Sequence, residues 1–117
     1  MADIKVSDLI KIIPDAFIPE NAKNKEAIIQ LIATGNDGGE WVIRIKDQIC
    51  EVEKGKTEKP DFSLKADSED ILKIFFGELD PLRAYMRGKI SFKGRIKQAM
   101  ELTNLFQNDR DFYESRL

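Results

Sequence analysis

The sequence predicts an α+β fold in which helices cover one face of a mostly antiparallel sheet. Two observations lead to this class. Apolar residues repeat with helical spacing at both ends of the chain, whereas the middle alternates between apolar and polar residues. Turn-forming residues separate the alternating segments from one another. A sheet with one apolar face needs a cover, and the helical segments supply it.

The chain begins with a predicted amphipathic helix. The apolar positions on its one face are Val6, Leu9, Ile10, Ile13 and Phe17. Ser7 or Asp3 is expected to cap the first turn, because both side chains accept hydrogen bonds from free backbone N–H groups. Pro14 and Pro19 are expected to end the helix, because proline lacks the N–H that would continue it.

Four strands are predicted next, as an antiparallel meander. They cover residues 27–33, 40–46, 49–53 and 61–66. Trp41 and Ile43 occupy alternate positions of the second segment, as residues on a buried strand face do. The glycine-rich stretch 35–39 marks the first turn. Asp47-Gln48 predicts a tight second turn, although the usual glycine is missing.

Helical spacing then returns. The polar side chains at 67–70 are expected to cap one helix, and Gly77 to end it. Asp80-Pro81 predicts the start of a short second helix, since proline suits the first helical position. Gly88 is expected to end that helix. A strand at 90–94 completes the predicted sheet.

A last helix is predicted after this strand. Its apolar positions are Ile96, Ala99, Met100, Thr103 and Phe106. The tail from Gln107 onward is polar, and we expect it to fray as exposed chain ends do.

The composition indicates one ordinary globular domain. A chain of 117 residues is roughly one domain in length, so we expect a single domain over residues 1–117. With 42% hydrophobic residues and a net charge of −2, it is unlike a disordered protein. No apolar run is long enough to cross a bilayer as a helix, and the first residues lack the apolar stretch of a signal peptide.

The absence of histidine and the presence of a single cysteine limit the catalytic and metal-binding sites that the chain can form. The chain has no histidine, which removes histidine-assisted nucleophiles, a histidine base and metal sites built on histidine pairs. Cys50 is the one cysteine, so an internal disulfide and a thiolate zinc site both lack a second sulfur. We expect no cofactor, no metal and no catalysis. A lone thiol suits the cytoplasm, whereas Ser115-Arg116-Leu117 is a close variant of the peroxisomal address and would apply in a eukaryote.

Large apolar side chains are frequent between residues 75 and 106. One interpretation is that they complete the core, because a helix that is apolar on several faces packs against several elements. The other is that they line an apolar cavity left between helices and sheet. Methionines in this set suit adaptable packing around variable ligands.

A basic segment runs from residue 83 to residue 97 without an acidic residue. Its six basic residues are Arg83, Arg87, Lys89, Lys93, Arg95 and Lys97. Such a segment suits transient contact with an anionic membrane surface or with a phosphorylated ligand. A solvated face is the alternative. Nucleic acid is not expected as a partner, because the mildly acidic chain carries no nucleic-acid-binding motif.

Several segments carry a family resemblance in their order and spacing. They are Gly39-Glu40-Trp41-Val42-Ile43, Lys59-Pro60-Asp61-Phe62-Ser63-Leu64, Asp80-Pro81 and Ala84-Tyr85-Met86-Arg87-Gly88-Lys89-Ile90. This pattern resembles the sterol carrier protein type 2 family, also called the sterol-transfer domain. The resemblance covers about residues 4–106 and is most specific from Gly77 to Gly94.

The resemblance implies a five-stranded, mostly antiparallel sheet covered by helices, with a hydrophobic tunnel between them. It implies that a fatty acid, fatty acyl-CoA, phospholipid or sterol is bound in this tunnel and transferred without catalysis. The tunnel-lining positions that it implies in this chain are Trp41, Ile43, Phe62, Leu72, Phe75, Phe76, Leu82, Met86, Phe92 and Met100.

Two departures from the family leave room for other outcomes. The family usually has glycine where this chain has Gln48, so the turn after Lys46 is expected to be longer or differently shaped. Many relatives are fused to enzymes. The alternative function is therefore an accessory module that docks on an enzyme for hydrophobic substrates or forms a homodimer, with little ligand binding of its own.

Overall fold

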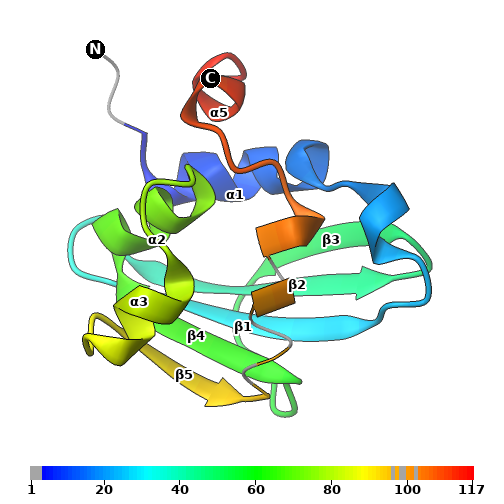
Figure 1. Ribbon diagram of the computed structural model, residues 1–117, viewed down its shortest axis with the longest axis horizontal. Helices are drawn as coiled ribbons and strands as arrows, with labels where there is room; N and C mark the ends of the chain where they lie inside the picture. The colour runs from blue at the N-terminus through cyan, green and yellow to red at the C-terminus, as the bar shows by residue number, and fades with distance from the viewer. Residues whose placement is uncertain (1–3, 96, 98–99, 102) are drawn as a thin grey trace.

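The computed structural model describes residues 4–95, 97, 100, 101 and 103–117. In this part of the chain, five strands form one sheet in the order β3-β2-β1-β4-β5, and helices cover one of its faces (Figure 1). The strands are β1 (Ala27–Thr34), β2 (Gly39–Lys46), β3 (Ile49–Lys54), β4 (Phe62–Asp67) and β5 (Ile90–Gly94). The helices are α1 (Val6–Ala16), α2 (Ser68–Phe75), α3 (Pro81–Met86), α5 (Arg110–Glu114) and the short 3₁₀ helices η1 (Pro19–Ala22) and η2 (Thr103–Leu105). The predicted α+β class is confirmed.

The pairing of β4 differs from the prediction. β1–β2, β2–β3 and β4–β5 are antiparallel, but β4 lies beside β1 and parallel to it, with Ile29 aligned with Phe62. The predicted four-strand meander is therefore wrong, because the chain crosses back from β3 to the far side of β1. Alternation decides which face a side chain takes but does not decide which strand becomes its neighbour.

Gln30 holds the crossing segment against the sheet. It aligns with Val42 and therefore lies on the face opposite the main core. Its amide nitrogen donates to the carbonyls of Trp41 (3.1 Å) and Gly55 (3.0 Å), and its Oε1 accepts from the backbone N–H of Thr57 (2.8 Å). A buried amide is stable when its donors and acceptor are paired in this way.

The core lies between the helices and the inner face of the sheet. Helix α1 contributes Leu9 and Ile13, β1 contributes Ile29 and Leu31, and β2 contributes Ile43. All five are at most 1% exposed. The alternation predicted for these strands is thus realised as a single apolar face, and burial of that face is the main stabilising term of the fold.

Helix α1 has a different start from the one predicted. The Asp8 carboxylate accepts a hydrogen bond from the backbone N–H of Lys5 (3.0 Å), while Ser7 lies inside the helix. Asp3 is outside the described residues. Pro14 lies within the last turn instead of ending the helix, which runs to Ala16. Near a helix end, proline removes one N–H donor without stopping the remaining turn from closing.

Helices α2 and α3 begin and end where the sequence predicts. The carboxylates of Asp67 and Asp80 accept hydrogen bonds from the backbone N–H two residues further on, at 3.1 and 3.3 Å. Gly77 and Gly88 follow these helices with φ values of +76° and +73°. Glycine takes this left-handed conformation at little cost, so it is suited to stopping a helix.

The turn between β2 and β3 is short. Lys46 pairs with Ile49, so two residues make the turn. Asp47 and Gln48 have φ values of +53° and +62°, as a type I′ turn requires. The tight turn predicted from Asp47-Gln48 is therefore confirmed, and the alternative of a longer turn is wrong. The Gln48 side chain donates to the carbonyl of Pro19 (3.0 Å), which ties this turn to η1.

The last predicted helix does not reach Phe106. Lys97, Met100 and Glu101 are helical, while Ile96 and Ala99 lie outside the described residues. From Thr103 the chain forms η2, and Phe106 then pairs with Phe17 in an isolated β-bridge. Their rings lie 5.7 Å apart. The prediction of a helix through Phe106 is therefore wrong, because Phe106 pairs with a residue far along the chain instead.

The C-terminal tail is packed, contrary to the predicted fraying. The backbone N–H of Gln107 donates to the carbonyl of Ala16 at 2.8 Å. Helix α5 then places Tyr113 in the core with 0% of its surface exposed. Tyr113 thus anchors a segment that is otherwise mostly polar. Among the described residues, no helix has the length and apolar character needed to cross a membrane.

Candidate functional site

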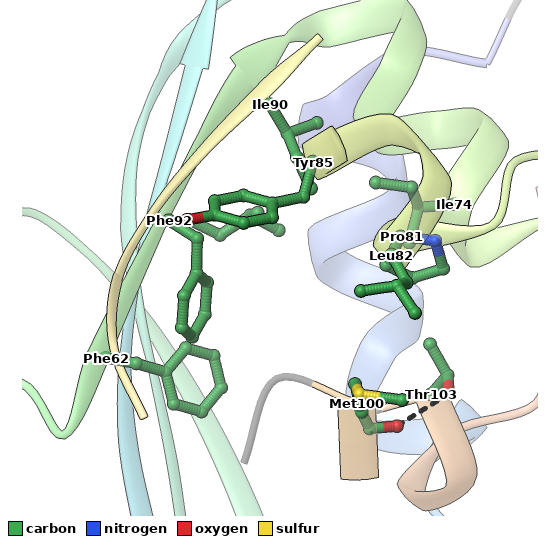
Figure 2. A pocket seen from close by; sticks show the side chains of 10 residues that line it. Phe62, Ile74, Pro81, Leu82, Tyr85, Ile90, Phe92, Met100 and Thr103 are labelled. Carbon is green, nitrogen blue, oxygen red and sulfur yellow. Dashed lines mark hydrogen bonds between the residues drawn. The ribbon is translucent and has the colours of Figure 1, made fainter. Parts of the chain in front are cut away.

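A small apolar cavity lies between α3 and the strands β4 and β5 (Figure 2). Its volume is about 30 Å³. The residues that line it are Phe62, Leu64, Ile74, Pro81, Leu82, Tyr85, Ile90, Phe92, Met100 and Thr103. Apart from two hydroxyl groups, these side chains are apolar, so the cavity is suited to an apolar group.

The strands form one wall of the cavity. Leu64 of β4 aligns with Phe92 of β5, and both side chains point to the helix-covered face. The rings of Phe62 and Phe92 lie with centroids 5.2 Å apart, and Figure 2 shows them next to each other on this wall. Their packing gives the wall a fixed, apolar surface.

Helix α3 forms the opposite wall. Its start is fixed by the Asp80 cap and by proline at the first helical position. Leu82 and Tyr85 are three residues apart, so both project from the face of α3 that lines the cavity. Figure 2 shows Leu82 beside Ile74, which belongs to α2, and Tyr85 on the side nearer β5.

Met100 and Thr103 close a third side. The Thr103 hydroxyl donates to the carbonyl of Met100 at 3.0 Å, so it is already paired within its own turn (Figure 2). Among the described lining residues, Tyr85 is the one with a titratable side chain. The arrangement can bury an apolar group, and it offers no carboxylate, thiol or amine for acid–base or nucleophilic chemistry.

Four of the predicted tunnel residues meet at this cavity. Phe62, Leu82, Phe92 and Met100 come from β4, α3, β5 and the segment before η2. They are distant in the sequence, and the fold brings them around one space.

Three other predicted residues lie in the core away from it. Trp41 and Ile43 are buried on β2, on the opposite side of β1 from the cavity strands. Phe75 packs edge-on against the ring of Phe106, with centroids 5.9 Å apart. These side chains stabilise the fold, and they are not among the lining residues.

The last three predicted residues also lie away from the cavity, and Phe76 among them is buried. Leu72 and Phe76 line a second hollow between α2, the start of α1 and α5. The side chain of Met86 is 76% exposed, the highest value among the large apolar side chains that the structure describes. Helical spacing sets Met86 one position beyond Tyr85, which rotates it away from the cavity.

Sequence reasoning missed six of the lining residues. They are Leu64, Ile74, Pro81, Tyr85, Ile90 and Thr103. Alternation could have indicated Leu64 and Ile90, since they lie two residues from Phe62 and Phe92 on the same face. The spacing from Leu82 could likewise have indicated Tyr85. No sequence signal points to Thr103.

The second hollow is larger, about 1100 Å³, and its lining mixes charged and apolar side chains. Arg110 on its rim lies over the ring of Phe76, with 4.8 Å from the guanidinium carbon to the ring centroid. Arg110 also donates to Glu78 at 2.8 Å. This hydrogen bond, together with the positive charge, holds the pKa of Glu78 below its ordinary value.

The Cys50 thiol and the carboxylates of the protein are further candidates for reactive or metal-binding groups. Burial, and to a smaller extent the neighbouring Glu51, raises the pKa of the Cys50 thiol to about 12, so it stays protonated and unreactive near neutral pH. Among the described residues, no group of three or more aspartate, glutamate or cysteine side chains is placed to hold a metal ion.

Comparisons with known proteins agree with this architecture. Residues 9–107 match the sequence profile of the SCP-2 sterol transfer family. Over 101 residues, the chain is 32% identical to hydroxysteroid dehydrogenase-like protein 2 of Rattus norvegicus, covering 86% of this chain and 19% of that protein. The chain thus spans about a fifth of the length of this curated relative.

Two solved structures share the fold over most of their length. The sterol carrier protein domain 2 of Helicoverpa armigera is 28% identical with a TM-score of 0.71, covering 93% of this chain and 88% of that one. Palmitated SCP2L2 from Aedes aegypti is 26% identical with a TM-score of 0.69, covering 86% of this chain and 93% of that one. With its profile match over most of the sequence and these structural likenesses, the chain belongs to the SCP-2 sterol transfer family.

Proposed function

We propose that this protein binds the apolar part of a lipid between α3 and the strands β4 and β5, and carries it without catalysing a reaction. The cavity is the observation that carries the proposal, because its lining is apolar and comes from five separate segments. Membership of the family supports lipid binding and transfer in general. Fatty acid, fatty acyl-CoA, phospholipid and sterol are the ligand classes that we propose.

Binding requires the cavity to open. A volume of 30 Å³ holds about two water molecules, far less than an acyl chain needs. Helix α3 is the element best suited to move. Gly77 and Gly88 flank it in left-handed conformations, and Ala84 is its buried residue. Displacing α3 would turn Leu82 and Tyr85 into the mobile wall of an enlarged site.

The driving force would be burial of apolar ligand surface. Each methylene group removed from water contributes about 0.8 kcal/mol, so a long acyl chain can offset the cost of moving α3. The solved Aedes aegypti relative is described as palmitated. Palmitate is therefore the first ligand to test.

Two substitutions separate this site from the rest of the core. Leu82→Asp places a carboxylate in the proposed binding site, whereas Leu72→Asp places one on α2 beside the second hollow. Both leucines are half-buried, so the two variants carry the same chemical change in comparable surroundings. We expect Leu82→Asp to weaken palmitate binding at least tenfold and Leu72→Asp to retain it.

The measurement is displacement of a fluorescent fatty acid by palmitate, with circular dichroism to verify folding. Native mass spectrometry and organic extraction of the purified protein give an independent readout. A co-purified lipid would support the proposal and identify its class. A wild-type protein that is bare and takes up no fatty acid contradicts it, as does a folded Leu82→Asp variant with unchanged affinity.

An accessory module for an enzyme is the second candidate. The coverage of 19% of a dehydrogenase-like relative favours it, because the same domain there accompanies a much longer chain. This candidate predicts a stable homodimer or enzyme complex in sedimentation experiments, and no uptake of free fatty acid. Turnover of a fatty acyl-CoA by the pure protein would contradict both candidates.

The proposed function also includes a contact for the charged head group of the ligand. We propose that the basic segment meets an anionic head group, since its residues begin on α3 and continue through β5. These residues are Arg83, Arg87, Lys89, Lys93, Arg95 and Lys97.

A further inference from the structure

The edge of the sheet at β5 combines positive charge with exposed apolar side chains. β5 is the last strand on this side, and α3 lies beside it (Figure 1). The basic segment supplies charge from α3, from the turn that follows and from β5 itself. We call this surface the α3–β5 edge. It is defined by Arg83, Met86, Arg87, Lys89, Lys93 and Arg95.

Most of this charge is not neutralised within the protein. Arg83 lies 3.8 Å from the carboxylate of Asp80. Among the described residues, no carboxylate lies within 4.0 Å of the side-chain nitrogens of Arg87, Lys89, Lys93 or Arg95. The positive field of this edge is therefore directed at solvent.

Two carboxylates, those of Asp61 and Glu101, have partners outside this edge. Asp61 accepts a hydrogen bond from the backbone N–H of Ile28 at 2.6 Å, and Glu101 lies 3.7 Å from Lys25. Protection of the edge strand against pairing with other strands would explain a charge at Lys93. Protection of the edge strand does not explain the positive charges of Arg87 and Lys89, because both residues lie outside β5.

Met86 supplies an apolar side chain in the middle of these charges. It precedes Arg87 and lies one helical turn after Arg83, and it is 76% exposed. Tyr85 and Met100, which are also exposed, line the cavity. A single exposed methionine is ordinary, but here it coincides with unneutralised basic charge on α3, the helix whose other side lines the apolar cavity.

We propose that the α3–β5 edge docks on a bilayer that contains anionic lipids. The basic side chains contact lipid phosphates and carboxylates, and Met86 lies below the head groups among the first methylenes. The proposal deepens the proposed function, on which it rests: docking places the mobile wall of the cavity against the membrane, so that a lipid passes between bilayer and protein without crossing water.

Charge substitutions test the docking surface. Arg87→Gln with Lys89→Gln removes two charges from the edge. Lys46→Gln with Lys54→Gln removes two exposed charges from β2 and β3, at the opposite side of the sheet. Each basic residue near an anionic surface contributes about fivefold to binding. We expect the first variant to bind vesicles about 25-fold more weakly, and the second to bind nearly as wild type.

A separate substitution tests the proposed apolar contact of Met86 with the bilayer. Met86→Gln keeps the length of the side chain and removes its apolar end. We expect weaker vesicle binding by roughly fivefold to tenfold, since part of a methionine's burial is lost. Added salt should weaken wild-type binding strongly and reduce the effect of the charge variant, but it should leave the effect of Met86→Gln in place.

The measurement is co-sedimentation with phosphatidylcholine vesicles, with and without phosphatidylserine. Selective binding to the serine-containing vesicles, lost in the edge variants and kept in the control, supports the proposal. Absence of selective binding overturns it, as do equal losses in both charge variants, which would indicate a general effect of net charge.

Fatty-acid displacement in solution separates this inference from the proposed function. The edge variants should retain palmitate binding, because the substituted side chains do not line the cavity. If the wild type binds palmitate but shows no preference for anionic vesicles, the docking surface is wrong and the carrier function stands. If anionic vesicles bind through the edge but no fatty acid is taken up, the docking surface stands and the carrier function is wrong.

Discussion

Tyr113 attaches the C-terminal segment to the rest of the protein. Its hydroxyl donates to the carbonyl of Gln107, and its ring lies 5.6 Å from the ring of Phe76. Tyr113→Ala should lower the free energy of unfolding by about 3–5 kcal/mol, because it leaves a cavity in the core. Tyr113→Phe keeps the ring and should cost about 1 kcal/mol for the lost hydrogen bond.

Urea denaturation of both variants measures these costs. A cost below about 1 kcal/mol for Tyr113→Ala would mean that the tail frays in solution, as the polar sequence of this segment predicts.

The hydrogen bond between Arg110 and Glu78 makes stability depend on pH. Because Arg110 lowers the pKa of Glu78 in the folded state, the folded protein holds this proton less tightly than the unfolded chain. The contribution of the pair is complete above the unfolded pKa of about 4.3 and is lost as the pH falls through the folded pKa.

Glu78→Gln should therefore be less stable than wild type at neutral pH, with a difference that shrinks as the pH falls. The measurement is the free energy of unfolding of both proteins between about pH 7 and about pH 3. Since both side chains are exposed, the difference should be small and should decrease with salt. A difference that grows on acidification would contradict the assignment.

At the scale of elements, two glycines each end a helix with a positive φ, but their surroundings differ. Gly77 and Gly88 end α2 and α3 with nearly equal positive φ. A methyl group at Gly77 would collide with the backbone carbonyl of Asn108, whereas nothing lies within 4 Å of one at Gly88. The positions therefore separate backbone strain from close packing.

Gly88→Ala should cost roughly 1–2 kcal/mol of unfolding free energy, the strain of a left-handed alanine. Gly77→Ala should cost clearly more, because the C-terminal segment must also shift. Thermal and urea unfolding of the pair check this order. Equal costs would show that Asn108 moves aside freely and that the segment before α5 is loosely held.

At the scale of the whole molecule, stability should be uneven. The central strand β1 is paired on both sides, whereas α3 is anchored by the buried residue Ala84. If α3 is the element that opens the cavity, its backbone amides should exchange with solvent well before those of β1. Bound palmitate should slow exchange in α3 more than in β1.

Hydrogen–deuterium exchange followed by mass spectrometry resolves these segments. Equal protection of α3 and β1 in the free protein would exclude α3 as the mobile wall. The lipid would then have to enter by displacement of another part of the lining, with the segment around Met100 as the next candidate.

The sequence predicted every strand to within a few residues, because alternation and turn chemistry act over short distances. The same holds for the ends of α2 and α3, which depend on a carboxylate cap and a following glycine. It did not predict that Pro14 lies inside α1, since one missing N–H is tolerated near a helix end.

The candidate site was predicted less completely. Phe62 and Leu82 meet at the cavity, while Phe75 and Met86, equally apolar, lie in the core and at the surface. Composition and resemblance mark all four as apolar positions of the same region. Which of them faces a shared space depends on how the helices pack against the sheet and which strands become neighbours, and both are set by contacts between distant segments.

By itself, the sequence determined the fold class, the approximate bounds of the strands and the starts and stops of α2 and α3. These follow from backbone conformation, residue period and composition, which need no knowledge of distant neighbours. The tertiary structure decided that β4 pairs with β1, that Tyr113 fixes the tail, and that the cavity lies beneath α3. Each of these is a choice among packings that satisfy the same local pattern, and such choices are decided by burial and pairing across the whole chain.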